Sequence, residues 1–255
     1  MSEDNNHNDL LVVDQIHTFI GQFHILEGVS LNVPRGSITV MLGRNGAGKT
    51  TTLKSILGLT PPQEGKVIFD GMEIQGKRAF NIANLGIGYV PEHRAIFRAL
   101  SVMENLKLAE RKKGDFNCHA DFIFTLFPDL KRLAKLPGNH LSGGQQQMLA
   151  VARALVPDNK LLLIDEPSEG LAPILIQQMM DAIRTLSQTT TILLVEQNFI
   201  MASQLARRFT IIDDGKSVHA GLMEDLVEDT EMIHRYLGAS IKTRRELEME
   251  HEAND

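Results

Sequence analysis

The residues from Gly43 to Thr50 read Gly-Arg-Asn-Gly-Ala-Gly-Lys-Thr, which matches the phosphate-loop signature G-x-x-x-x-G-K-[ST]. An apolar stretch of β type, residues 37–42, precedes the loop, and a helix-like stretch follows it, as the signature requires. Glycines let successive backbone N–H groups point toward one anion, and the N-terminus of the following helix adds partial positive charge. The pattern predicts a site for a nucleoside triphosphate.

Two side chains of this loop have specific expected roles. Lys49 should reach the β- and γ-phosphates, and the hydroxyl of Thr50 should ligate Mg²⁺. A glycine turn that merely joins a strand to a helix is the alternative, but it does not account for Lys-Thr at this spacing. The residues predicted to bind the nucleotide here are Gly43, Arg44, Asn45, Gly46, Ala47, Gly48, Lys49, Thr50 and Thr51.

A pair of carboxylates, Asp165 and Glu166, follows the apolar run of residues 161–164. Such a run is typical of a parallel strand that is buried on both faces, and the carboxyl end of that strand opens onto the ligand crevice. Asp165 is expected to hold Mg²⁺ through water, and Glu166 to orient or deprotonate the attacking water. The alternative is an acidic turn at the end of a strand.

A second glycine motif, Leu141-Ser142-Gly143-Gly144-Gln145, opens a strongly helical run. Ser142 suits a helix N-cap, and the two glycines let the backbone approach an anion closely. An ordinary capped helix would give the same local pattern. Two anion-binding helix starts in one chain need an explanation, however.

Composition excludes several classes of protein. The chain has 255 residues, 43% of them hydrophobic, and a formal charge of −6, so nucleic acid is not expected as its main partner. The single cysteine, Cys118, excludes a disulfide framework and fits a reducing compartment. No apolar run reaches the roughly 20 residues that a membrane helix needs. We therefore expect a cytoplasmic protein that would serve a membrane process only through partners.

Short strand-like stretches alternate with helix-like ones, which predicts a mostly parallel α/β sheet with right-handed crossovers. Residues 102–136 differ, because their apolar positions recur at helical spacing with no strand between them. This segment is expected to be a helical insertion. The predicted strands are residues 10–16, 23–33, 37–42, 66–69, 87–90, 161–164, 191–195 and 209–212, and the predicted helices are 49–57, 148–155, 174–186 and two within 223–237.

The two glycine motifs and the Asp165-Glu166 pair, in this order and spacing, resemble the nucleotide-binding subunits of ATP-binding-cassette (ABC) transporters. The resemblance extends from about Leu10 to Gly238. It implies the P-loop NTPase ABC-ATPase fold, an α/β class with a mostly parallel central sheet, an antiparallel β subdomain and a helical subdomain. The expected organisation is a disordered tail over 1–9, the nucleotide-binding domain over 10–239 with its helical subdomain at about 95–155, and a charged tail over 240–255.

The resemblance also implies partners. Two such subunits pack head to tail, so that each ATP, with Mg²⁺, lies between the phosphate loop of one and the Leu141–Gln145 helix of the other. Ile96, Phe97, Arg98 and the helical insertion would contact transmembrane permease subunits, which work in turn with a solute-binding protein. The subunit would lie peripherally on the cytoplasmic face of the cell membrane.

Four positions depart from the common pattern of that family. Ile20, beside Phe19, stands where an aromatic residue usually stacks on adenine, and Ala172 stands where an aspartate is usual. Glu92 replaces a glutamine that approaches Mg²⁺ and the attacking water, and Gln197 replaces a histidine that contacts the γ-phosphate. We expect Glu92 and Gln197 to act in catalysis, and Glu92 also as a metal ligand. The alternative for Glu92 is a surface ion pair with Arg94 or Arg98.

These departures, with Val195-Glu196-Gln197-Asn198 and Tyr236-Leu237-Gly238, are similar to the shorter ATPase of branched-chain amino acid uptake systems and of their urea and amide relatives. That subfamily typically pairs with a second, non-identical ATPase, so a homodimer and a heterodimer both stay open. One alternative is a catalytically weak regulatory subunit that binds ATP without turnover. Soluble cassettes of translation or repair usually carry extensions that this chain lacks, and kinases or GTPases would lack Leu141–Gln145. The transported solute is not encoded here.

Overall fold

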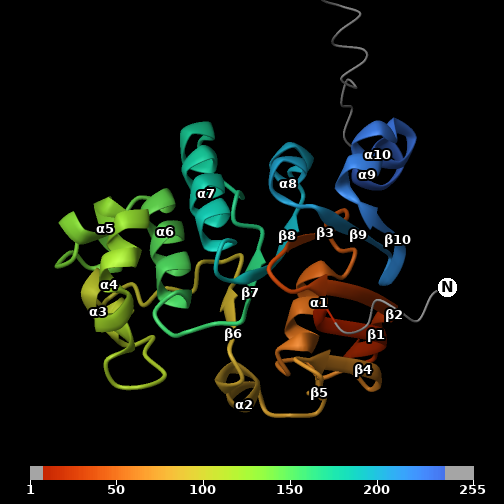
Figure 1. Ribbon diagram of the computed structural model, residues 1–255, viewed down its shortest axis with the longest axis horizontal. Coiled ribbons are helices and arrows are strands. Elements are labelled where there is room, and N and C mark those ends of the chain that lie inside the picture. The colour runs from red at the N-terminus through yellow and green to blue at the C-terminus, as the bar shows by residue number, and fades with distance from the viewer. Residues whose placement is uncertain (1–7, 239–255) are drawn as a thin grey trace, which may run out of the picture.

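The computed structural model describes residues 8–238, and it contains two β-sheets (Figure 1). The first sheet is antiparallel, with the strand order β2-β1-β4-β5. It consists of β1 (Asp9–Ile20), β2 (Phe23–Pro34), β4 (Glu64–Phe69) and β5 (Met72–Glu73). Asp70 and Gly71 form the tight turn between β4 and β5, both with positive φ.

The second sheet has six strands in the order β10-β9-β3-β8-β7-β6. Its strands are β3 (Ile38–Leu42), β6 (Ile87–Val90), β7 (Leu161–Asp165), β8 (Thr191–Glu196), β9 (Arg208–Asp213) and β10 (Lys216–Leu222). All neighbouring pairs are parallel except β9 and β10, which form a hairpin. The predicted mostly parallel central sheet and the separate antiparallel sheet are confirmed.

Four helices, α3 to α6, gather at the end of the molecule that lies away from the antiparallel sheet (Figure 1). They follow one another without an intervening strand, as the pattern over residues 102–136 predicted. They are α3 (Val102–Lys107), α4 (Asp115–Leu126), α5 (Pro128–Arg132) and α6 (Gly143–Ala154). The other helices are α1 (Lys49–Ile56), α2 (Ala79–Asn84), α7 (Pro173–Leu186), α8 (Phe199–Leu205), α9 (Met223–Glu228) and α10 (Thr230–Leu237).

The central sheet separates two hydrophobic cores. In β7, Leu162 and Ile164 belong to the core shared with α3–α6, whereas Leu161 and Leu163 belong to the core shared with α1 and the antiparallel sheet. Alternate side chains of a strand point to opposite faces, so a strand buried on both faces needs an uninterrupted apolar run. This requirement explains the apolar sequence before Asp165, and it fixes the strand end at which that carboxylate appears.

The structure corrects several boundaries. The first strand runs to Ile20 rather than Ile16, because register shifts around Gln15 let it stay paired beyond the expected end. Asp9, assigned to the N-terminal tail, pairs with Pro34 and belongs to β1. Helices α2 and α8 were not predicted. Residues 1–7 and the predicted charged tail, 240–255, lie outside the described residues, and within residues 8–238 no helix is long and apolar enough to cross a membrane.

Candidate active site

The phosphate loop leaves β3 after Leu42 and enters α1 at Lys49, the strand–turn–helix context that the motif predicted. Its conformation depends on glycine at Gly43, where φ is 152° and an added Cβ would lie 2.2 Å from the carbonyl oxygen of Ile212. The loop is also held by the β9–β10 turn, since the N–H of Gly215 donates to the carbonyl of Ala47 at 2.9 Å. The central sheet therefore fixes the loop on two sides.

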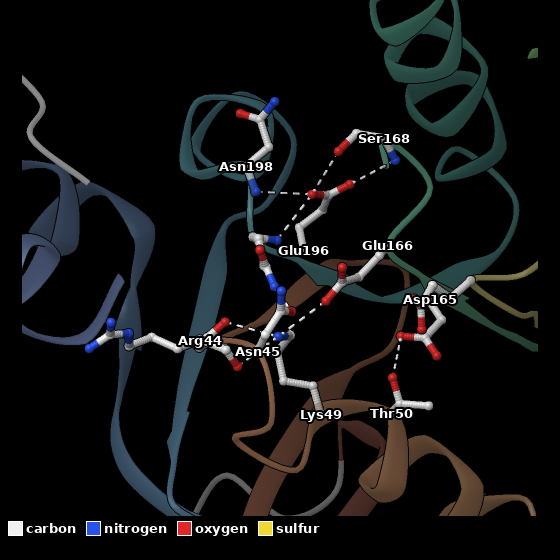
Figure 2. A network of polar contacts seen from close by, with 12 residues as sticks. Arg44, Asn45, Lys49, Thr50, Asp165, Glu166, Ser168, Glu196 and Asn198 are labelled. Carbon is white, nitrogen blue, oxygen red and sulfur yellow. Dashed lines mark hydrogen bonds and ion pairs between the residues drawn. The ribbon is translucent and has the colours of Figure 1, made fainter. Parts of the chain in front are cut away.

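The ammonium group of Lys49 lies inside the loop with only 4% of the residue exposed. Its Nζ donates to the carbonyl oxygens of Gly43 at 2.9 Å and Arg44 at 3.1 Å, and it forms an ion pair with Glu166 Oε1 at 3.1 Å (Figure 2). A buried cation requires oxygen partners of this kind. Phosphate oxygens of a nucleotide would supply the same interaction at the same place.

Asp165 ends β7 and is fully buried. Thr50 Oγ1 donates to its Oδ1 at 3.2 Å (Figure 2), and the Tyr89 hydroxyl donates to its Oδ2 at 3.3 Å. Burial raises the pKa of Asp165 to about 6, against the lowering effect of these two hydrogen bonds, and the charges of Glu166 and Glu92 raise it further. A buried carboxylate beside a hydroxyl is a set of hard oxygen donors that suits Mg²⁺.

Glu166 follows Asp165 with a left-handed backbone, φ 45°, which is unusual for a residue with a side chain. Its N–H donates to the carbonyl of Val195 at 2.9 Å, and its carboxylate points at Lys49 (Figure 2). Unfavourable backbone conformations of this kind concentrate at functional sites. Here the conformation directs the carboxylate into the phosphate loop.

Gln197 follows β8 and reaches the exposed part of the phosphate loop. Its side-chain Nε2 donates to the Oδ1 of Asn45. The structure thus brings Gln197, Glu166, Asp165 and the phosphate loop together, although their sequence positions span more than half of the chain.

Glu92 follows β6 and is close enough to Asp165 and Tyr89 for its charge to raise the pKa of both side chains. Its carboxylate approaches His93 Nδ1 at 3.8 Å. Over residues 8–238 it makes no ion pair with Arg94 or Arg98, so the alternative expected for this residue is not observed.

The Leu141–Gln145 motif forms the start of α6. Ser142 Oγ accepts from the N–H of Gln145 at 3.3 Å, and Gln145 Oε1 accepts from the N–H of Ser142 at 3.0 Å, so the predicted N-cap is confirmed as a reciprocal capping box. Arg94 lies beside this turn, because a Cβ added to Gly143 would be 3.2 Å from its guanidinium. No hydrogen bond or ion pair in the described part of the chain joins this motif to the phosphate loop.

Phe19 and Ile20, predicted to contact the base, lie at the end of β1. The Phe19 ring stacks on His24, with centroids 4.1 Å apart and planes 6° from parallel, and Ile20 is 48% exposed. Three further residues of the site, Tyr89, Ser168 and Glu196, were not predicted from the sequence. Glu196 could have been noticed, because it is a carboxylate at the end of an apolar strand and directly precedes Gln197.

Comparison with known proteins gives a consistent result. The model of the family described as "ABC transporter" matches residues 26–169. The chain is 38% identical to the high-affinity branched-chain amino acid transport ATP-binding protein BraG of Pseudomonas aeruginosa, over 90% of this chain and 100% of that protein. It is 36% identical to a probable branched-chain amino acid transport ATP-binding protein, LivF, of Archaeoglobus fulgidus, over 81% and 89% of the two chains.

Among solved structures, the fold resembles a dimeric ATP-binding cassette in a post-hydrolysis state bound to ADP and Pi. The TM-score is 0.74 at 24% identity, and the match covers 84% of this chain and 98% of the other. At this level of identity the likeness shows the fold.

Proposed function

The chain belongs to the ABC transporter family, whose cassettes bind and hydrolyse ATP, and from that premise we propose that it drives a membrane importer of branched-chain and other hydrophobic amino acids. One observation carries the catalytic part of the proposal: Lys49, Thr50, Asp165, Glu166 and Gln197 converge on one phosphate loop. The similarity to BraG and LivF supports the solute class. The urea and amide importers are the alternative for the solute.

In the proposed mechanism the phosphate loop binds the phosphates of ATP through its backbone N–H groups and through Lys49. In the structure, Lys49 is paired with Glu166 at 3.1 Å. When phosphate oxygens replace that partner, the Glu166 carboxylate becomes available to accept a proton from the attacking water. Gln197 would donate its amide N–H toward the γ-phosphate from its position beside Asn45.

Thr50 and Asp165 would hold Mg²⁺, and Glu92 would approach it from the end of β6. When bound, the ion would neutralise negative charge on the β- and γ-phosphates. The buried Asp165 carboxylate, with its raised pKa, is suited to this role because a cation would offset the cost of its burial.

A second ATPase subunit would complete the site, with its Leu141–Gln145 helix, or the equivalent one in a non-identical partner, facing the γ-phosphate. Permease subunits would contact the surface beyond Glu92, where Ile96 and Arg98 line an open cavity. Phe97 is 45% exposed there, with the guanidinium of Arg153 4.8 Å from its ring centroid. The subunit would thus sit on the cytoplasmic face of the membrane.

The catalytic proposal is tested by Glu166→Gln in a phosphate-release assay. The variant should bind ATP normally, because the loop, Lys49 and Asp165 are retained, while hydrolysis falls by about 10²–10⁴-fold. Asp181→Asn is the matched control, since it removes an exposed carboxylate from α7 whose partners among residues 8–238 are Gln177 and Arg184 alone. Hydrolysis by Glu166→Gln at the rate of the control would contradict the role of Glu166. A wild-type chain that binds ATP without turnover, alone and with its permease, would favour the regulatory alternative.

The solute class is tested by transport. The chain would be co-purified with its permease and solute-binding protein and reconstituted in liposomes. ATP-dependent uptake of labelled leucine or isoleucine is expected, with labelled urea and acetamide as the discriminating substrates. Uptake of the amides alone would replace the amino acid proposal with its alternative.

A further inference from the structure

Glu196 is a buried carboxylate at the end of β8 that no step of the proposed mechanism uses. The residue is 1% exposed and lies directly before Gln197. Burial raises the pKa of its carboxyl group. A buried carboxylate is costly unless its oxygens accept hydrogen bonds, so its partners indicate what it does.

Four donors surround this carboxylate (Figure 2). Oε1 accepts from the N–H of Ser168 at 3.1 Å. Oε2 accepts from the Ser168 hydroxyl at 3.0 Å and from the N–H groups of Gln197 and Asn198, each at 3.1 Å. Three of these donors converge on Oε2 and one bonds to Oε1, so both oxygens of the carboxylate are hydrogen-bonded inside the protein.

The donors come from two different loops. Ser168 belongs to the loop after β7, two residues beyond Glu166, whereas Gln197 and Asn198 begin the loop after β8. The N–H of Glu166 is bonded in turn to the carbonyl of Val195, the residue before Glu196. The two groups proposed to act on the γ-phosphate, Glu166 and Gln197, are therefore joined through a single side chain.

We infer that Glu196 is a positioning residue, which sets the Glu166 loop and Gln197 relative to each other so that both address the same γ-phosphate. It acts through these loops rather than on the nucleotide, because the side chain is 1% exposed and both of its oxygens bond to loop groups. This inference rests on the proposed ATPase function. The left-handed φ of Glu166, 45°, is a conformation that needs such support from its surroundings.

The test is Glu196→Gln, which keeps the size of the side chain. Its amide has one acceptor oxygen and one donor nitrogen, so at least one backbone N–H loses its acceptor: that of Ser168 if the nitrogen takes the place of Oε1, or those of Gln197 and Asn198 if it takes the place of Oε2. Misplacement of catalytic groups by a fraction of an ångström to one ångström lowers turnover steeply, and we expect kcat to fall about 10–100-fold. KM and the affinity for ATP should change less than about threefold, because the phosphate loop is untouched.

Thr191→Val is the matched control, at the opposite end of the same strand. Thr191 Oγ1 accepts from the N–H of Gly36 at 2.9 Å and is far along β8 from the site. This substitution also deprives a backbone N–H of a buried acceptor. It should lower the melting temperature and leave kcat near the wild-type value.

A second variant keeps the inference testable if Glu196→Gln does not fold. Ser168→Ala removes one donor and leaves both backbone loops in place, so it should lower kcat less than Glu196→Gln, with unchanged KM. In the Glu166→Gln background, Glu196→Gln should add little further loss, because residues that act as one unit are non-additive.

A wild-type kcat in Glu196→Gln, or equal losses of kcat in Thr191→Val at equal loss of melting temperature, would overturn the inference. If Glu196→Gln does not fold, wild-type kcat in Ser168→Ala overturns it. Failure of the wild-type chain to hydrolyse ATP would instead overturn the proposed function, so the two failures are distinguishable.

Discussion

The buried carboxylate of Asp165 is a proposed ligand of Mg²⁺, and burying it in its ionised form lowers the stability of the folded protein. Its pKa is raised to about 6 by burial, so the folded protein binds a proton there more tightly than the unfolded chain does. For a carboxyl group whose pKa rises on folding, the ionised form destabilises the native state at a pH above about 6. That cost declines as the pH falls toward the unfolded pKa of about 4.

Asp165→Asn should therefore stabilise the nucleotide-free protein. We expect the free energy of unfolding to rise by about 1–3 kcal/mol at pH 7.5, and the gain to shrink as the pH falls to 5. Urea denaturation at both values measures it, with Asp181→Asn as a control that should stay within about 0.5 kcal/mol of wild type. Loss of stability in Asp165→Asn at pH 7.5 would contradict the assigned cost of burial.

Glu92 supplies a second test at the same scale. Its carboxylate is near Asp165, and two carboxylates near ATP repel the phosphates unless a divalent cation balances them. Glu92→Gln should therefore shift the Mg²⁺ concentration for half-maximal ATPase activity. The dependence is measured by titration of Mg²⁺ at saturating ATP, with Asp181→Asn as the control. Superimposable curves with equal rates would remove Glu92 from the metal site.

At the scale of elements, the register between β1 and β4 depends on Gly65. Its φ is 85°, and an added Cβ would lie 2.2 Å from the carbonyl oxygen of Gln15, where β1 shifts register. Neither backbone can move without disturbing the antiparallel sheet. Gly65 is therefore needed for β1 and β4 to pair in this register, in the sheet that carries Phe19 and Ile20.

Gly65→Ala should cost about 2–4 kcal/mol, from a left-handed backbone and a clash with another strand. Gly71→Ala is the matched control, since φ is 77° there but an added Cβ meets nothing within 4 Å. It should cost about 1–2 kcal/mol, the backbone part alone. The free energy of unfolding of both variants is measured by chemical denaturation. Equal losses would contradict the prediction, because they would mean that the backbone at Gln15 moves aside for the added Cβ at little cost.

The sequence predicted those elements whose local pattern is strong. The mainly apolar run before the phosphate loop predicted β3, the uninterrupted apolar run before Asp165 predicted β7, and the capping residue Ser142 predicted the start of α6. Helix α2 has six residues and no side-chain cap, so it left little local signal. For α8 a signal existed, because the Asn198 side chain caps the helix through the N–H of Met201 at 3.1 Å.

The parts of the candidate site that lie within sequence motifs were predicted, whereas the contacts between those motifs were not. The phosphate loop and the carboxylate pair each follow from residues adjacent in sequence. The contact between Gln197 and Asn45 joins residues 152 positions apart, and that between Glu196 and Ser168 joins residues 28 positions apart. Only the order of strands in the sheet brings these residues together. The position of Glu196 at a strand end could be read from the sequence, but its contact with Ser168 could not.

At the scale of the whole molecule, the two motifs that we propose bind the nucleotide lie apart from each other. The phosphate loop adjoins the sheets, whereas the Leu141–Gln145 motif starts α6 among the helices at the other end (Figure 1). Two copies arranged head to tail would combine one half from each. That arrangement predicts complementation between two inactive variants.

Lys49→Ala disables the phosphate loop, and Gly143→Asp places a negative charge in the exposed first turn of α6, where it repels an anion without breaking the helix. Each variant alone should hydrolyse ATP poorly. A mixture forms one intact site, from the loop of the second and the helix of the first, and should recover up to about half of the wild-type rate per mixed dimer. A mixture that stays inactive would contradict a pair of identical chains and point to a different ATPase as the partner.

The phosphate loop is ordered by contacts of its own, with Lys49 held by two of the loop's carbonyl groups. The conformational entropy of ordering it is lost during folding, so little of the affinity for a nucleotide is spent on it. The α- and β-phosphates that such a loop grips are common to ATP and ADP. If the loop binds ATP as proposed, we expect it to retain ADP through these shared phosphates, so that the rate of a cycle would depend on the release of ADP as well as on the binding of ATP.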